Sequence, residues 1–221
     1  MMLADSVEMM RIATLAKANN LQLCTHAIGD SANRTILKLY SQILPKNNLK
    51  RWRIEHAQVV NYNDYMYYSD YSIIPSVQPT HAISDMPWVK KRIGTERLHS
   101  AYAYKNLLNA SGTIALGTDF PVEAINPLAT FYTAVARKDK EGNPEMGFLK
   151  ENALSRFEAL KGMTIWAAYS VFQEKKKGSL QIGKQADIII LDKDIMRINE
   201  SEILKTQVLY TFCKGKIKYK K

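Results

Sequence analysis

Short apolar or alternating runs and amphipathic segments follow one another in strict alternation along the first part of the chain. The short runs have the length of strands, whereas the segments between them repeat apolar residues at the three- and four-residue spacing of a helix. The expected strands are 21–25, 51–55, 72–78 and 113–118, and the expected helices are 5–17, 30–44, 61–69, 101–109 and 127–137. Strands that alternate with helices are joined by crossovers and lie parallel, so this pattern predicts an α/β fold.

The spacing of polar residues just after the strands favours a closed barrel over an open sheet. His26 and His56 are 30 positions apart, and Asp119 lies 63 positions further on. About 31 residues per unit are expected where about 250 residues form eight strand–helix units. No Gly-rich phosphate-binding sequence follows a strand, which argues against a nucleotide-binding open sheet. We therefore expect a TIM-type (β/α) barrel, of which four strands are identified.

The carboxyl-terminal part of the chain has a different pattern. Ser155 and Glu158 form a capping box that begins a helix running to about Tyr169. A strand at 186–191 and a hairpin over 208–219 follow. We therefore divide the chain into a partial barrel, residues 1–177, and a small β appendage, residues 178–221. The connection 84–99 is long for such a fold and is expected to be a functional loop.

Composition places the chain among folded proteins of the cytoplasm. Of its 221 residues, 46% are apolar and 24% charged, which is typical of a chain with a buried core. Two cysteines, Cys24 and Cys213, cannot form a disulfide framework, which indicates a reducing compartment. Residues 1–20 lack the apolar core of a secretion signal, and no run approaches the roughly 20 residues that span a bilayer. We expect no association with membranes.

The net charge of +10 raises the possibility of a nucleic-acid partner. The positive charge is dispersed, however, apart from 175–177 and 214–221. Tyrosines gather in 62–71 at helical spacing with acidic neighbours, which is unlike the basic, aromatic groove of a single-strand binder. We expect no nucleic-acid partner.

Three residues in equivalent places point to a metal site. His26, His56 and Asp119 each follow a strand, and in parallel architectures sites lie at the carboxyl ends of strands. Imidazole and carboxylate suit zinc, iron or manganese, and we expect a divalent metal, with zinc favoured. Such a metal activates water, and Asp119 could then move protons as a general base. Each residue alone could equally be a polar strand end satisfied by hydrogen bonds.

Four other polar residues lie in sequence contexts that do not indicate a metal ligand: His81, His99, Asp30 and Glu55. His81 follows a strand end and could bind substrate or polarise a carbonyl as a second catalytic residue, or could be a loop histidine bonded to backbone. His99 has basic neighbours and is interpreted as structural. Asp30 is expected to cap a helix, and Glu55 to form an ion pair with Arg53 or with a neighbouring strand.

Several stretches resemble the amidohydrolase superfamily, in its type 3 branch, which includes N-substituted formamide deformylases. The stretches are 25–30 (Thr-His-Ala-Ile-Gly-Asp), 53–58 (Arg-Ile-Glu-His-Ala-Gln), 78–82 (Gln-Pro-Thr-His-Ala), 84–88 (Ser-Asp-Met-Pro-Trp), 117–123 (Gly-Thr-Asp-Phe-Pro-Val-Glu) and 178–187. The resemblance runs nearly from end to end. It implies that His26 and His56 are the metal ligands of the fifth and sixth barrel strands. It also implies that Asp119 is the eighth-strand ligand and general base, and that the activity is hydrolysis of C–N bonds in amides or cyclic amides.

The resemblance also implies that part of the barrel is absent. Family members begin with appendage strands and a first barrel strand carrying His-x-His, a pattern that this sequence does not contain. The chain then corresponds to about the last four βα units. We expect a small-molecule amide-type substrate, with association either with itself or with a complementary amino-terminal half, or poor solubility, because a half-barrel exposes unpaired strand edges. The rival hypothesis is a non-catalytic remnant or scaffold that retains part of a metal site.

Overall fold

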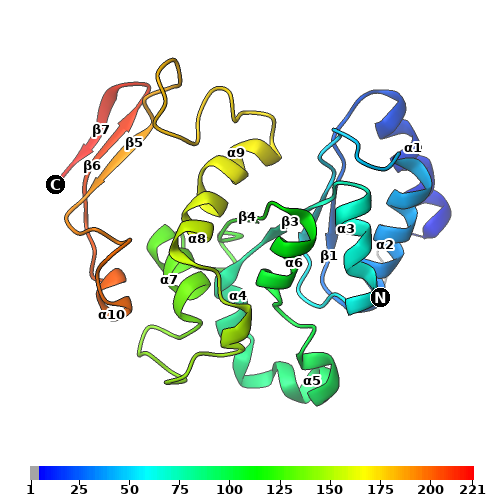
Figure 1. Cartoon of the computed structure of the whole chain (residues 1–221), viewed down its shortest axis with the longest axis horizontal. Coiled ribbons are helices and arrows are strands. Elements are labelled where there is room, and N and C mark those ends of the chain that lie inside the picture. Colours follow the sequence, from blue (N-terminus) through cyan, green and yellow to red (C-terminus); the bar gives the residue numbers. More distant parts are fainter. Residues whose placement is uncertain (1–4) are drawn as a thin grey trace. The chain divides into compact units, whose positions relative to one another are not determined.

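The computed structural model describes residues 5–221, which form two compact units. The first comprises Met1–Val77 and Pro87–Ala115, and the second comprises Gln78–Met86 and Leu116–Lys221. Both contain helices and strands (Figure 1), which confirms the α/β class. Across residues 5–221, no helix has the length and apolar character needed to cross a membrane.

The first unit is a parallel sheet with helices packed on it. Its elements are α1 (Ser6–Ala18), β1 (Cys24–Ala27), α2 (Asp30–Ile43), β2 (Arg53–His56), the 3-10 helix η1 (Tyr62–Asp64), α3 (Tyr65–Asp70), β3 (Ile74–Val77), α5 (Met86–Leu98) and α6 (Tyr104–Ser111). β1 pairs with β2 and β2 with β3, in parallel as predicted. The strand order is β1-β2-β3-β4, where β4 is Ala115–Leu116. Figure 1 shows α2 and α3 side by side, with α2 next to β1.

Trp52 lies in the centre of the first unit's core. Its side chain is fully buried, and its indole N–H donates to the carbonyl of Leu21 at 3.1 Å. The indole also meets the ring of Tyr40 edge-on, with the centroids 4.9 Å apart. The hydroxyl of Tyr40, on α2, is 2.6 Å from that of Thr25 on β1. These contacts hold α2 against the two strands that carry the predicted histidine ligands.

The second unit packs several helices on α7. Its elements are α4 (Pro79–Ser84), α7 (Pro127–Ala136), the 3-10 helix η2 (Lys150–Asn152), α8 (Arg156–Met163), α9 (Ile165–Ser170), β5 (Ile188–Leu191), α10 (Glu200–Ile203), β6 (Val208–Cys213) and β7 (Lys216–Lys220). Nearly all side chains of α7 are buried, as expected of a helix that is apolar on every side. α4, α8 and α10 all contact it.

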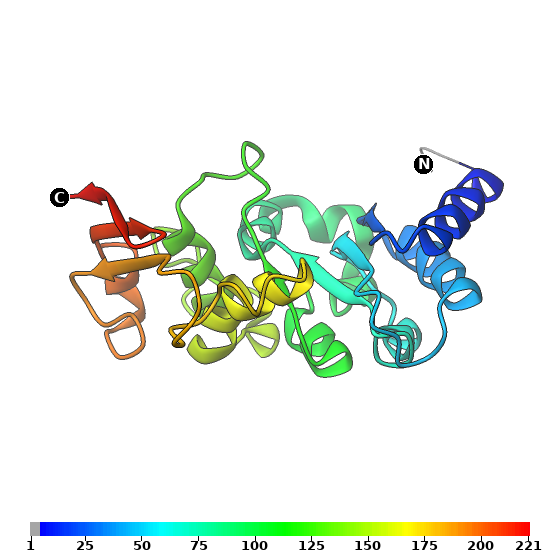
Figure 2. The ribbon, with the colours of Figure 1, turned by 90° about the horizontal axis from the view of Figure 1, so that it is seen from above.

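β5, β6 and β7 form a separate antiparallel sheet in that order, which confirms the predicted hairpin (Figure 2). The hairpin turns at Lys214 and Gly215, both with positive φ. β7 is an edge strand that is exposed along its length and alternates lysines with Ile217 and Tyr219. Lysines on an edge strand disfavour pairing with a further strand.

The prediction of an irregular loop over 84–99 is wrong. This region is helical, with α4 ending at Ser84 and α5 following from Met86, interrupted at Gly94 (φ 76°, ψ 170°). Pro79 and Pro87 both lie in the first turn of a helix, where the missing N–H group would have had no partner in the helix.

Two further details differ from expectation. The helix predicted over 155–169 is broken at Thr164 (φ −126°, ψ −94°), although the capping box that begins it is confirmed. Asp30 does not cap α2: the cap residue is Gly29, and Asp30 lies inside the first turn, where its Oδ1 accepts from the N–H of Ser31 at 2.9 Å. A carboxylate there still interacts favourably with the positive end of the helix dipole.

Candidate metal centre and the second-unit histidine

His26 and His56 lie side by side at the carboxyl ends of neighbouring strands in the first unit. In the parallel register, His26 is opposite Glu55 and Ala27 is opposite His56. The two imidazole rings meet edge to face, with centroids 4.5 Å apart. His26 is exposed, whereas His56 is buried. Imidazole nitrogens are common ligands of zinc, so this contact concerns two of the residues predicted to bind a metal.

The backbone at His56 makes this contact possible. Strand alternation would place His56 on the opposite face of the sheet from His26, because His56 is one position beyond Glu55. His56 and Ala57 instead have φ of 75° and 43°, so the strand ends in a left-handed turn. Such a conformation costs about 1–3 kcal/mol per non-glycine residue and is concentrated at functional sites. This turn accompanies the contact between the imidazoles of His56 and His26.

Asn33 of α2 ties together the loops that follow the two histidines. It is fully buried, and its Nδ2 lies 3.0–3.2 Å from four carbonyl oxygens. These belong to Ala27, Ile28 and Gly29, which follow His26, and to Val59, which follows His56. One amide group thus connects both loops. Sequence analysis gave Asn33 no role, although a polar residue on the buried face of a helix was an available signal.

Replacing Asn33 by alanine is expected to destabilise the protein by about 1–3 kcal/mol, because buried carbonyls lose their donor. Urea denaturation followed by circular dichroism measures the free energy of unfolding. The matched control is Asn109→Ala, at an exposed helical asparagine in α6, which should change stability by less than about 0.5 kcal/mol. Equal losses in the two variants would contradict the role assigned to Asn33.

The neighbours of His26 in the sheet include a carboxylate, on Glu55, and a thiol, on Cys24. The predicted ion pair of Glu55 is confirmed, since its Oε1 is 2.8 Å from Nε of Arg53. Partial desolvation raises the pKa of the Cys24 thiol, an effect larger than the opposing attraction of Arg53. A thiol with a raised pKa ionises less readily to the thiolate, the form that binds metals. Cys24 and Cys213 are both free.

The second unit holds Asp119 and His81. Asp119 follows β4 with φ of 56°, and its carbonyl accepts from the N–H of Val122 at 2.8 Å in a tight turn. His81 lies in α4 and is buried. Its Nε2 is 3.9 Å from Oε1 of Glu123, and the hydroxyl of Ser84 donates to the same oxygen at 2.5 Å. Sequence analysis assigned no function to Ser84 or Glu123, although both fall within the stretches that carried the family resemblance.

Among the predicted site residues, His26 contacts His56, and His81 lies beside Glu123. Within residues 5–221, no three His, Cys, Asp or Glu side chains form a group that could hold a metal ion. His99 is exposed just beyond the end of α5.

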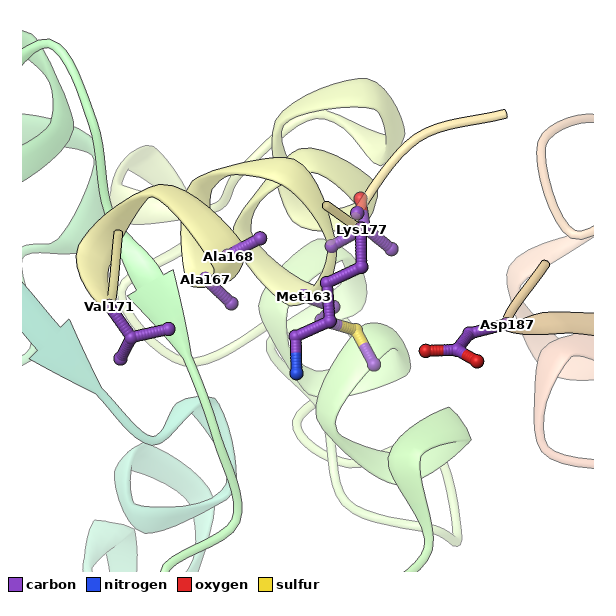
Figure 3. A pocket seen from close by; sticks show the side chains of 8 residues that line it. Met163, Ala167, Ala168, Val171, Lys177 and Asp187 are labelled. Atoms are coloured by element: carbon purple, nitrogen blue, oxygen red, sulfur yellow. The ribbon is translucent and has the colours of Figure 1, made fainter. Parts of the chain in front are cut away.

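A cavity of about 340 Å³ lies in the second unit against α8 and α9 (Figure 3). Met163, Ala167 and Val171 contribute apolar surface, and Lys177 and Asp187 contribute charged groups. None of the described residues that line it is a predicted ligand or catalytic residue. The cavity therefore supplies no support for the predicted chemistry.

Comparison with known proteins identifies the family. Residues 1–219 match the profile of the Amidohydrolase family, in its type 3 group. The chain belongs to this family, and the resemblance found in its motifs is thereby confirmed.

Individual relatives are longer than this chain. Protein LONG AFTER FAR-RED 3 of Arabidopsis thaliana is 35% identical over 218 residues, which cover 97% of this chain and 37% of the relative. N-substituted formamide deformylase of Arthrobacter pascens is 26% identical over 212 residues, covering 95% and 39%. The crystal structure of an uncharacterised metal-dependent hydrolase from Pyrococcus horikoshii matches with a TM-score of 0.78 at 31% identity, covering 90% and 39%. The chain thus spans about two fifths of the length of these relatives.

Proposed function

We propose that this chain supplies His26, His56 and Asp119 to the metal site of an amidohydrolase that cleaves C–N bonds of amides or cyclic amides. The observation that carries the proposal is the contact of the two imidazoles at adjacent strand ends, in a chain of this family. The relatives support it as well: the Pyrococcus horikoshii protein is a metal-dependent hydrolase, and the Arthrobacter pascens protein is a deformylase of N-substituted formamides, which are amides.

The residues of this chain have distinct roles in the proposed reaction. His26 and His56 offer imidazole nitrogens and Asp119 a carboxylate, a set that fits zinc and also iron or manganese. A divalent metal held by these residues would supply the chemistry that makes water nucleophilic at neutral pH. Asp119 would serve as the general base and then as the acid that protonates the departing nitrogen. His81 contacts the amide group of the substrate.

The proposal includes an incomplete barrel. The four strands β1 to β4 would be the last four βα units of a TIM-type barrel, and the sheet β5–β7 its small β appendage. The remaining units would come from a complementary amino-terminal segment carrying the family's His-x-His pair, which this sequence lacks. β1 lies at one edge of its sheet, which is where a further strand would be added.

A non-catalytic remnant is the second candidate. The observation that favours it is the absence, within residues 5–221, of any group of three potential ligands. Under this alternative the histidine pair persists without turnover, and the protein acts as a scaffold.

Substituting Asp119 by asparagine separates the two candidates. The variant should keep its fold, because asparagine tolerates the left-handed φ of 56° at this position. Loss of a general acid–base group should lower hydrolysis about 10²- to 10⁴-fold. Formate release from N-substituted formamides, measured with added zinc on the native assembly, is the readout. No zinc-dependent release by the unsubstituted protein would favour the remnant.

A further inference from the structure

His81 is buried and faces the partly buried carboxylate of Glu123, a contact that metal binding does not explain. The Nε2 atom of His81 is closed off from solvent and faces Oε1 of Glu123 at 3.9 Å. The two side chains are only 8% and 17% exposed, so little water screens their interaction. At this separation the contact is electrostatic, since a hydrogen bond would be about 1 Å shorter.

Ser84 fixes the carboxylate in this position. Its hydroxyl has a single proton and lies 2.5 Å from Oε1 of Glu123 and 3.1 Å from the carbonyl of Thr80. The shorter contact, to a charged acceptor, is the stronger of the two. Ser84 and His81 are three residues apart in α4, so they lie on the same side of that helix and both reach Glu123. α7, which packs against α4, has no charged residue and offers His81 no competing charge.

We propose that Glu123 is a positioning residue that holds a proton on Nε2 of His81, with Ser84 fixing the carboxylate. In a histidine, the partner of one nitrogen decides which nitrogen carries the proton, and an anion beside Nε2 favours N–H at Nε2. Nε2 is then a donor that faces the carboxylate of Glu123.

This inference rests on the proposed function and sharpens it. It names the residues that position His81, the side chain proposed to contact the amide group of the substrate.

The test is the tautomer of His81, read by long-range ¹H–¹⁵N correlation in the full chain labelled with ¹⁵N-histidine. The sequence contains four histidines, and His81→Gln identifies the signals of His81. The variants are Glu123→Gln and Ser84→Ala. The matched control is Glu141→Gln, at an exposed loop carboxylate.

In the unsubstituted protein the Nε2–H form should dominate. Glu123→Gln should lower the ratio of the Nε2–H form to the Nδ1–H form by at least about threefold, because the attraction of the carboxylate is lost. Ser84→Ala should shift the ratio in the same direction by less, and Glu141→Gln should leave it unchanged. An unchanged ratio in Glu123→Gln would overturn the proposal. If that variant does not fold, as judged by the signals of the other three histidines, an unchanged ratio in Ser84→Ala overturns it.

The measurement needs neither metal nor substrate, so it is independent of hydrolysis. A shifted ratio in a protein that hydrolyses no amide would refute the proposed function alone. Hydrolysis by a protein whose ratio does not shift would refute the positioning role alone.

Discussion

Substituting both His26 and His56 by alanine should abolish zinc binding by this protein, and each single substitution should weaken it more than about 100-fold. The reason is that loss of a residue that merely supports a metal ligand already costs about 10- to 100-fold in affinity. Loss of a ligand itself should exceed that range. The imidazoles are in contact across two strand ends, so neither can be replaced by a neighbouring histidine. Equilibrium dialysis against zinc, followed by metal analysis, measures both stoichiometry and affinity.

The control for this experiment is His99→Ala. His99 is exposed beyond α5 and belongs to the same unit as the histidine pair, so its loss should leave zinc binding unchanged. Zinc retained by the double variant at the original stoichiometry would contradict the assignment of His26 and His56 as ligands. Absence of zinc from the unsubstituted protein would favour the non-catalytic alternative.

Substituting Trp52 by alanine should produce the largest loss of stability, about 3–5 kcal/mol. The indole is fully buried, contacts Tyr40 edge-on, and donates to the carbonyl of Leu21. The variant loses the buried apolar surface and also leaves that carbonyl without its indole donor. Urea denaturation followed by far-ultraviolet circular dichroism measures the change, and the midpoint should fall accordingly.

The matched control is Trp88→Ala. Trp88 lies in α5 and is 46% exposed, so its removal leaves no buried cavity. Its effect should stay within about 1 kcal/mol. Equal destabilisation by the two substitutions would show that Trp52 is not at the centre of the first unit's core.

The parallel strands could be predicted because each is bounded by polar or turn-forming residues and separated from the next by a helix. The predicted limits of the strands differ from the observed ones by a few residues. The strand expected at 21–25, for example, is Cys24–Ala27 in the structure. A strand begins where its neighbour can pair with it, and β1 pairs from Cys24 because β2 begins at Arg53. The helix α5 was missed because its sequence has no clear apolar stripe and contains Gly94.

For the candidate site, spacing was sufficient to place His26 and His56 at neighbouring strand ends, because parallel strands in sequence usually pair with each other. The contact between the rings required the left-handed turn at His56, which no local propensity predicts for a histidine before alanine. The ion pair of Arg53 and Glu55, by contrast, follows from local geometry alone. Residues two apart in a strand share a face, so this pair could be predicted from the sequence.

Periodicity, spacing and motif order are therefore enough for the α/β class, the family and the identity of the candidate ligands, because these properties reside in short stretches of chain. The folded chain was needed to show that Asn33 joins the two histidine loops, that Glu123 lies beside His81, and that Ser84 donates to Glu123. Asn33 and Val59 are 26 residues apart, and Ser84 and Glu123 are 39 apart. Contacts over such separations depend on how helices and loops pack in the folded chain, which local sequence patterns do not encode.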